Sequence, residues 1–412
     1  MKILVLNAGS STQKNYLYEL EKGPLNEMSP PLWSGKIDWS RQEGMAEIEV
    51  KSGNQKLAET RPSESREKAI ASLLETLWQG KTQAIADPSE IDVVGHRIVH
   101  GGEKYREATL ITPEVKSAIA HLAKLAPAHN SANLQGIEAV EKILPNVPQI
   151  AVFDTAFHAD LPLETVVYPL PYEWYQQGIR RYGFHGISYQ YATQRTADLL
   201  GKPLESLRMI VCHLGNGCSL AAIKNGKSVE TTMGFTPLEG LMMGTRSGSI
   251  DPGILIHQMR SQQFTVDELD SILNRESGLK GVSGVSSDMR DIHTAIEEGN
   301  ERAKLAFDMY VHRLRLQIGA MLPILGGLDV LVFTGGVGEN QSSVRSGACE
   351  GFEFLKLHLD PHKNQNSPTD ADIATIESQV RVFVIQAQED WAIARECWHS
   401  LTKNQSYTQS SF

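Results

Sequence analysis

Three glycine-rich segments follow apolar, strand-like runs and have the composition of anion-binding turns. They cover residues 7–12, 213–217 and 335–340. Glycine lets the backbone approach a phosphate closely, and the N–H groups of a turn can surround its oxygens. None of the three matches the GxxxxGK[ST] pattern of a P-loop or the GxGxxG fingerprint of a dinucleotide fold. One such segment alone is most often ordinary turn chemistry, but three beside Asn and hydroxyl residues predict a nucleotide site without a P-loop.

Two arginines lie among small and apolar residues, where an unpaired guanidinium would be costly to bury. Arg97 lies in the segment Gly-His-Arg-Ile-Val-His-Gly-Gly-Glu, and Arg246 lies in Met-Gly-Thr-Arg-Ser-Gly-Ser. The guanidinium fork pairs with carboxylates or phosphates. Each arginine taken alone favours an internal salt bridge with a nearby acid, and an anion-binding role is the alternative.

One carboxylate and one imidazole complete the set of candidate groups. Asp154 directly follows the apolar run 149–153, where α/β folds place functional carboxylates and where a helix N-cap is an equal alternative. His185 lies between Phe184 and Gly186, a setting in which a lone histidine is more often structural than catalytic. Together these residues predict an anion-handling α/β enzyme without specifying its reaction.

Strand and helix signals alternate in a similar order through both halves of the chain. The first half predicts strands over 2–6, 15–20, 91–94 and 149–153, and helices over 69–78 and from Thr112 onward. The second half predicts strands over 208–213, 219–223 and 329–333, with an Asn-Gly hairpin turn at 225–226. We expect two α/β domains, each a sheet with helices, that face one another across a cleft.

Composition excludes several classes of function. The chain has 412 residues, enough for two domains of roughly 200 residues each. A formal net charge of −10 argues against a nucleic-acid partner, and no apolar run approaches the ~20 residues of a membrane span. The apolar stretch at the N-terminus is too short for a signal peptide. Four cysteines without metal or redox spacing indicate a reduced, cytoplasmic setting.

Seven short motifs occur in an order that resembles the acetate kinase family. They are Asn7-Ala8-Gly9-Ser10-Ser11, Gly95-His96-Arg97, His100-Gly101-Gly102-Glu103, the segment 153–158, the segment 182–186, the segment 213–217 and the segment 233–240. The resemblance extends from residue 1 to about residue 399 and includes residues 334–340 and Glu389.

The resemblance implies a duplicated actin-like (ribonuclease H-like) fold with an interdomain active-site cleft. The N-terminal domain would comprise residues 1–154 and about 386–412, on the carboxylate and metal side, and the C-terminal domain would comprise 155–385, on the nucleotide side. The implied reaction is reversible, Mg²⁺-dependent, direct in-line transfer of the ATP γ-phosphate to acetate, giving acetyl phosphate and ADP. Mn²⁺ can stand in for Mg²⁺. The implied enzyme is a cytoplasmic homodimer with no nucleic-acid or membrane partner.

The resemblance also assigns residues by matching motif to motif. The catalytic groups would be Arg97, Asp154, His185 and Arg246, and the metal would be held by Asn7 and Glu389. The acid would bind to Arg97 in a pocket lined by Val99, Ala128, Phe184 and Pro237. The nucleotide would contact Lys14, His213, Leu214, Gly215, Asn216, Gly217, Asp288, Met289, Arg290, Gly336, Val337, Gly338, Glu339 and Asn340.

These implied roles agree with elementary chemistry. Acetate is ionised at neutral pH, so it needs no general base. Asp154 is therefore expected to position the substrate, the metal or an arginine rather than to remove a proton. The obstacle is repulsion between two anions, which the two arginines, His185 and the metal would offset. We expect transfer without a phosphoenzyme.

Several positions depart from the family pattern. Thr12, Ile187, Tyr189 and Ser249 replace the usual Ser, Thr, His and Asp, and residues 386–390 read Gln-Ala-Gln-Glu-Asp. At Ala128 leucine is typical, so the smaller side chain predicts room for a longer acid such as propionate. The alternatives to an acetate kinase are a propionate or butyrate kinase of the same family and a non-catalytic nucleotide-binding hinge protein.

Overall fold

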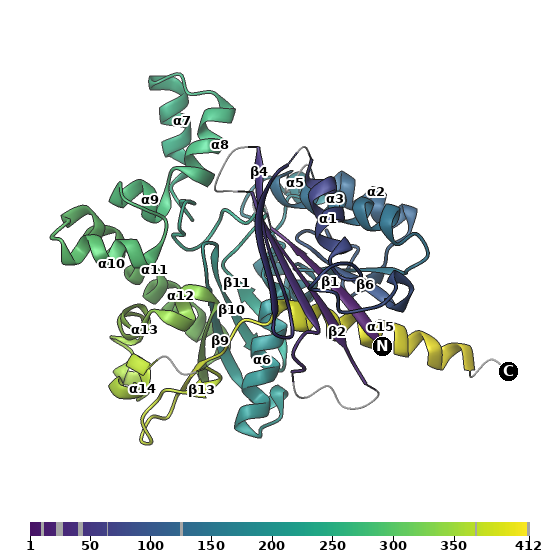
Figure 1. Cartoon of the computed structure of the whole chain (residues 1–412). Coiled ribbons are helices and arrows are strands. Elements are labelled where there is room, and N and C mark those ends of the chain that lie inside the picture. Colours follow the sequence, from purple (N-terminus) through teal and green to yellow (C-terminus); the bar gives the residue numbers. More distant parts are fainter. Residues whose placement is uncertain are drawn as a thin grey trace. The chain divides into compact units, whose positions relative to one another are not determined.

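The computed structural model describes residues 1–9, 12–21, 28–39, 44–63, 65–123, 127–366 and 369–409, without the side chains of 127–128 and 403–409. The chain divides into two compact units (Figure 1). Unit 1 comprises Met1–Ala156 and Gln388–Phe412, and unit 2 comprises Phe157–Ala387.

Unit 1 contains a mixed sheet of eight strands in the order β5-β4-β3-β2-β1-β6-β8-β7. The strands β1 to β5 form an antiparallel meander, whereas β1, β6 and β8 are mutually parallel. Their bounds are β1 Lys2–Ala8, β2 Thr12–Glu19, β3 Trp33–Asp38, β4 Met45–Ser52, β5 Gln55–Pro62, β6 Val93–Ile98, β7 Thr109–Leu110 and β8 Gln149–Phe153.

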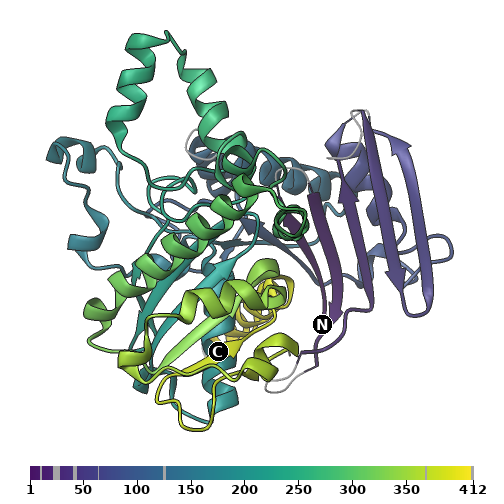
Figure 2. The ribbon, with the colours of Figure 1, turned by 90° about the vertical axis from the view of Figure 1, so that its left-hand side faces the viewer.

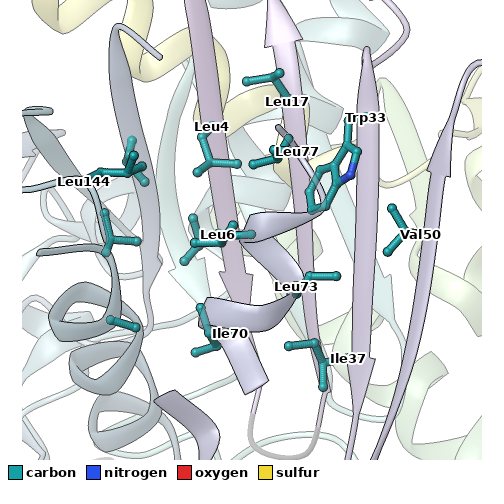
Figure 3. Close-up of a cluster of buried hydrophobic side chains, with 14 of the residues drawn as sticks. Leu4, Leu6, Leu17, Trp33, Ile37, Val50, Ile70, Leu73, Leu77 and Leu144 are labelled. Carbon is teal, nitrogen blue, oxygen red and sulfur yellow. The ribbon is translucent and has the colours of Figure 1, made fainter. Parts of the chain in front are cut away.

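Helices cover both faces of the unit 1 sheet. On one face, α1 (Arg66–Glu75) and α3 (Pro127–Ile143) pack on apolar side chains that alternate along β1 to β4, as Figure 3 shows. The core there includes Leu4, Leu17, Trp33 and Leu73. The short helix α2 (Pro113–Leu122) begins at the expected N-cap, Thr112, and α15 (Glu389–Gln409) packs on β1 and β6 from the other face.

The strand expected over residues 91–94 begins and ends later than predicted, at Val93–Ile98, so Gly95, His96 and Arg97 lie within β6. Gly95 does not mark a turn. A Cβ atom at this position would lie 2.5 Å from Sγ of Cys397 and 2.8 Å from Cγ2 of Ile393. The glycine therefore permits close packing of α15 on the strand, which a periodicity argument cannot detect.

Unit 2 contains a six-stranded sheet in the order β11-β10-β9-β12-β14-β13. The strands are β9 Arg208–Leu214, β10 Cys218–Lys224, β11 Lys227–Thr231, β12 Val330–Thr334, β13 Ala371–Asp372 and β14 Arg381–Val384. The predicted Asn-Gly hairpin is confirmed between β10 and β11, where φ is 54° at Asn225 and 73° at Gly226.

The helices of unit 2 are α4 Leu163–Val166, α5 Tyr172–Gln176, α6 Gly186–Leu200, α7 Pro252–Ser261, α8 Val266–Arg275, α9 Gly278–Ser283, α10 Met289–Glu297, α11 Glu301–Leu325, α12 Gly335–Asn340, α13 Ser342–Cys349 and α14 Pro361–Asn366. In Figure 2, α7 and α8 (green) are adjacent helices that extend away from the sheet of their own unit. The segment expected as a glycine-rich turn over 335–340 is in fact the short helix α12.

All four cysteines, Cys212, Cys218, Cys349 and Cys397, are buried free thiols. Among the helices of the described residues, none has the length and apolar character required to cross a bilayer.

Candidate active site

The sequence-predicted residues of unit 1 meet at the ends of adjacent parallel strands. Arg97 is the penultimate residue of β6, and Asp154 directly follows β8, its neighbour in the sheet. The Arg97 guanidinium donates to the Asp154 carboxylate from Nη2 at 2.7 Å and from Nε at 3.1 Å. The internal salt bridge that the sequence favoured for Arg97 is therefore present.

Two further residues join this ion pair on the same face of the sheet. Asn7, near the end of β1, accepts from Nη1 of Arg97 at 3.3 Å and donates to Glu389 at 3.2 Å. Glu389, the first residue of α15, has Oε2 3.6 Å from Nη1 of Arg97. The four groups form one connected polar cluster, which we call the carboxylate cluster: Asn7, Arg97, Asp154 and Glu389.

Burial controls the electrostatics of the carboxylate cluster. Removal from water raises the pKa of Asp154 to about 6, and the negative charge of Glu389 adds to the increase, while the Arg97 guanidinium opposes it. The pKa of Arg97 is raised because two carboxylates outweigh the cost of burying its charge. At neutral pH the pair is therefore ionised, and Asp154 fixes one edge of the guanidinium while Nη1 lies toward Asn7 and Glu389.

Side chains of α3 hold the segment that follows β6. Asn133 accepts from the N–H of Val99 at 3.1 Å and donates to the carbonyl of Ala8 at 3.3 Å. One turn earlier, Asn130 accepts from the N–H of His100 at 3.0 Å and donates to its carbonyl at 3.1 Å. Both asparagines are fully buried and were not singled out from the sequence, although their spacing of three places them on one helix face.

Val99, a predicted pocket residue, is buried beside these contacts. The side chain of Ala128, predicted to line the same pocket, lies outside the described residues.

Unit 2 brings together a second group of predicted residues around two histidines. The rings of His185 and His213 stack with centroids 4.2 Å apart. Ser219 on β10 is 2.8 Å from Nδ1 of His185, and Ser188 on α6 is 2.8 Å from Nδ1 of His213. Each imidazole is thus oriented by a serine hydroxyl, and neither serine was predicted to contribute.

Arg246 is the cation of this second group. Its Nη1 donates to the carbonyl of Pro237 at 3.2 Å. Among the described residues no carboxylate pairs with Arg246, so the internal salt bridge expected from the sequence is absent there. Burial lowers its pKa, and a Cβ on Gly217 would lie 3.3 Å from its Nη1 and 3.6 Å from Nε2 of His185. The guanidinium of Arg246 and the imidazole of His185 therefore both lie against the glycine-rich segment at Gly217.

The backbone at His185 is held in the left-handed region, with φ of 60°. The preceding residue, Phe184, is buried, and its carbonyl is 3.0 Å from Nε2 of His158. Nδ1 of His158 is 2.8 Å from the hydroxyl of Ser228. With both nitrogens bonded, His158 fixes the segment that carries Phe184 and His185.

A clamp of three side chains fixes the loop that leads to Pro237. Nη2 of Arg181 donates to Glu239 at 2.9 Å, and its Nη1 donates to the carbonyls of residues 231–233. The hydroxyl of Tyr168 donates to the other oxygen of Glu239 and accepts from the N–H of Phe235. Sequence reasoning missed this clamp of Tyr168, Arg181 and Glu239, because its members are spread over 71 positions.

The predicted nucleotide residues occupy three places in unit 2 and one in unit 1. His213 and Leu214 end β9, and the turn that follows is closed by a bond from Gly215 N to Gly217 O at 3.1 Å. Asn216 accepts from Gly244 N at 3.0 Å, and a Cβ on Gly244 would also contact the carbonyl of Ser287. Gly244 therefore links the turn to the segment before α10.

Asp288 is the N-cap of α10 and forms a salt bridge with Arg290, whose side chain is exposed, while Met289 is buried. The remaining unit 2 residues, Gly336, Val337, Gly338, Glu339 and Asn340, lie in α12, and α12 packs against β9. At Gly335 φ is 78°, and a Cβ there would lie 2.8 Å from the carbonyl oxygen of Leu214, so both the backbone conformation and the close contact favour glycine. Lys14 lies on β2 in unit 1.

The sequence profile of the acetokinase family matches residues 2–395. Two curated relatives named acetate kinase, from a Cyanothece species and from Gloeobacter violaceus, are 61% and 62% identical over 405 residues each. The alignments cover 98% of this chain and 99% and 100% of those proteins.

Solved structures give the same result. The chain is similar to the acetate kinase of Porphyromonas gingivalis, with a TM-score of 0.88 and 42% identity over 97% of this chain and 99% of that one. It is also similar to a propionate kinase of Francisella tularensis, with a TM-score of 0.87 and 36% identity over 96% and 98% of the two chains. The duplicated actin-like fold is thus the fold of this chain, which belongs to the acetokinase family, a family of phosphotransferases.

Proposed function

We propose that the chain transfers the γ-phosphoryl group of ATP to acetate, giving acetyl phosphate and ADP, and that it catalyses the reverse reaction. The observation that carries this proposal is the environment of Arg246. Its guanidinium is partly buried, pairs with no carboxylate among the described residues and points with His185 toward the glycine-rich segment. A partly buried cation of this kind is suited to stabilise an anionic group in transfer.

In unit 1, Arg97 is the proposed ligand of the acid. Asp154 binds the Nε and Nη2 edge of its guanidinium, which fixes the plane and directs Nη1 toward Asn7. A carboxylate substrate needs a cation in a defined orientation rather than a base, because it is already ionised. Asp154 is therefore a positioning group for Arg97, and the proton-transfer role of a general base is not required.

In unit 2, His185 and Arg246 are the proposed donors to the transferred phosphoryl group. The turn 213–217, residues 288–290 and α12 are the proposed contacts of the nucleotide, together with Lys14 of unit 1. The transfer is direct, so a chiral γ-phosphate is expected to be inverted. Retention of configuration would instead demand a phosphoenzyme and would contradict this part of the proposal.

The carboxylate cluster also fits a magnesium ion. Asn7 and Glu389 offer an amide oxygen and a carboxylate within one hydrogen-bonded group. Mg²⁺ prefers oxygen ligands and is often bound by one or two carboxylates together with substrate phosphates and water. Bound there, the ion would neutralise phosphate charge. Mn²⁺, which takes similar ligands, is the expected substitute.

The test of the proposal is trapping of acyl phosphate with hydroxylamine, using ATP, Mg²⁺ and either acetate, propionate or butyrate. Strong product with acetate supports the assignment. A preference for propionate or butyrate would retain the fold and the chemistry and change the substrate. A protein that binds ATP but yields no product with any acid would instead be a nucleotide-binding hinge protein.

The alternative substrate, propionate, is favoured by one feature of this chain and by one comparison. Ala128 replaces the leucine typical of the family, and a propionate kinase is among the solved structures that this chain resembles. The one methylene by which propionate exceeds acetate changes the relative transition-state free energy of the two substrates by only about 1–3 kcal/mol. Restoring leucine with Ala128→Leu should increase the penalty for propionate relative to acetate. An unchanged ratio of kcat/KM values would remove Ala128 as a determinant of specificity.

We further propose that the enzyme is a cytoplasmic homodimer. Helix α7 carries three large apolar side chains that are about half exposed: Ile254, Ile256 and Met259. A second copy of this chain would cover that surface. Light scattering should give the mass of a dimer, and Ile256→Glu should shift it toward a monomer, whereas Ser261→Glu on the same helix should not.

A further inference from the structure

Three lysines gather on one face of the unit 1 sheet, beside the carboxylate cluster. Lys14 on β2, Lys36 on β3 and Lys51 on β4 line a hollow of about 160 Å³, far more than one water molecule occupies. Tyr16, Ser34, Gly35 and Glu49 complete its lining. We call it the lysine hollow.

The strand register places the lysine hollow on the same face as the carboxylate cluster. Asn7 is directly opposite Lys14, and Lys14 is directly opposite Lys36. Residues opposite one another on neighbouring strands project from the same face. Arg97 belongs to this row as well, since its Nη1 donates to Asn7. Arg97, Asn7, Lys14 and Lys36 therefore lie in one row across four neighbouring strands, about 5 Å apart from strand to strand.

Glu49 extends the first row, because it is opposite Lys36. A second row runs beside the first. Tyr16 is opposite Ser34, and Ser34 is opposite Lys51. The opposite face of the same strands is occupied by the apolar core, where Trp33 and Val50 are buried. The lysines therefore cannot turn inward, and their charges remain on the face that carries the carboxylate cluster.

The charges of the lysine hollow favour an anion. Three lysines and one glutamate line it, in a chain whose formal net charge is −10. Lys36 is partly neutralised by Asp38, at 3.1 Å. Within the described part of the chain, Lys14 and Lys51 have no ion-pair partner, which leaves two ammonium groups and two hydroxyls as donors. Two ammonium groups without carboxylate partners around one space are suited to a multivalent phosphate rather than to a monovalent carboxylate.

We propose that the lysine hollow is a second phosphate-binding site, which takes a di- or polyphosphate group beside the carboxylate cluster. Lys36 and Lys51 are new contacts that neither the motifs nor the carboxylate cluster includes. The phosphate can belong to the nucleotide or to free pyrophosphate, and the chemistry of the lysine hollow is the same for both. The binding itself does not depend on which acid the enzyme phosphorylates.

The test is calorimetric titration of the full-length, nucleotide-free protein with inorganic pyrophosphate. Lys36→Gln and Lys51→Gln should each weaken binding by about threefold to tenfold at low ionic strength, and the double variant should weaken it further. Lys81→Gln, at an exposed lysine away from the sheet, removes the same charge and should change the affinity by less than about twofold. Thermal unfolding checks that each variant is folded.

A second titration, at a saturating concentration of a non-hydrolysable ATP analogue, identifies the source of the phosphate. If the lysine-dependent binding of pyrophosphate disappears, the lysine hollow holds the phosphates of the nucleotide, an outcome that rests on the proposed kinase function. If it persists, the lysine hollow binds free phosphate independently. Equal affinities in the double variant and in Lys81→Gln, or no binding of pyrophosphate to the wild type, would overturn the proposal while acetate-dependent turnover remained intact.

Discussion

The imidazole rings of His185 and His213 stack at 4.2 Å with their planes inclined by 28°. Ser219 orients the first ring through Nδ1 and also bonds the hydroxyl of Tyr189 at 2.5 Å. Because Ser219 acts on His185 and not on substrate, Ser219→Ala should lower kcat by about tenfold and change the KM for ATP little. Steady-state kinetics with ATP and acetate varied separately measure this split.

Tyr189→Phe is the matched control for Ser219. It removes the other partner of the same serine and keeps the bond to His185, so kcat should remain within about twofold of wild type. Equal losses in the two variants would show that general packing around α6, rather than the orientation of His185, explains the effect of Ser219→Ala.

The salt bridge between Arg97 and Asp154 gives a second prediction. Arg97→Lys retains the positive charge but loses the bidentate contact with Asp154. The ammonium group of lysine is not held in a fixed plane as the guanidinium is. The kcat/KM for acetate should fall by about 100-fold or more, with a smaller change in the KM for ATP. Arg195→Lys alters an Arg–Asp pair with Asp370, outside both groups of predicted residues, and should leave kcat/KM unchanged. Similar losses in both variants would contradict a specific role for Arg97.

The sequence identified Arg97 and Asp154 separately but could not show that they pair. They are 57 positions apart, and their contact depends on β6 and β8 being adjacent and parallel, with their carboxyl ends at the same edge of the sheet. Apolar runs predict that strands exist and where they end, but they do not predict the order of strands within a sheet. For that reason the motifs predicted which residues are catalytic candidates, and only the fold shows that two of them form a salt bridge.

The missed features have a common physical cause. The predicted strand ended before Gly95, whereas this glycine lies within β6, where the close approach of Cys397 and Ile393 explains it. Asn130 and Asn133 bond to backbone groups of other elements, and such bonds leave no periodic signal in the sequence. Contacts between segments that are distant in the sequence explain the residue type at each of these positions, and the local sequence pattern does not reveal such contacts.

Acid should destabilise the protein partly through His158. Burial lowers the pKa of His158 to about 4, from about 6.5 in an unfolded chain. Between these values the unfolded state binds more protons, so the stability that the neutral ring contributes is complete above about pH 6.5 and is lost as the pH falls toward 4. The loss amounts to at most about 3 kcal/mol.

His158→Gln isolates this contribution, since glutamine can still accept from Ser228 and donate to the carbonyl of Phe184. Urea midpoints measured from pH 7 to pH 4.5 should fall more steeply for the wild type than for the variant. Buried His96, whose pKa is also lowered to about 4, remains in both proteins and leaves a common residual slope. Parallel curves would show that His158 does not titrate differently in the folded and unfolded states.

The clamp of Tyr168, Arg181 and Glu239 makes Gly234 a sensitive position. A Cβ there would lie 1.7 Å from Oε2 of Glu239 and 2.0 Å from Oη of Tyr168, so alanine must displace at least one of these two half-buried side chains. Gly234→Ala should therefore lower the free energy of unfolding by about 2 kcal/mol or more and reduce kcat, because the same loop carries Pro237.

Gly319, inside α11, is the contrasting position, since no atom lies within 4 Å of its would-be Cβ. Gly319→Ala should stabilise the protein by about 0.5–1 kcal/mol with unchanged kcat, because alanine loses less backbone entropy than glycine in a helix. The two substitutions add the same methyl group. If Gly234→Ala lowers the free energy of unfolding and Gly319→Ala raises it, the effect at Gly234 is due to the clamp. If Gly234→Ala were neutral in both stability and kcat, the clamp would not position the loop.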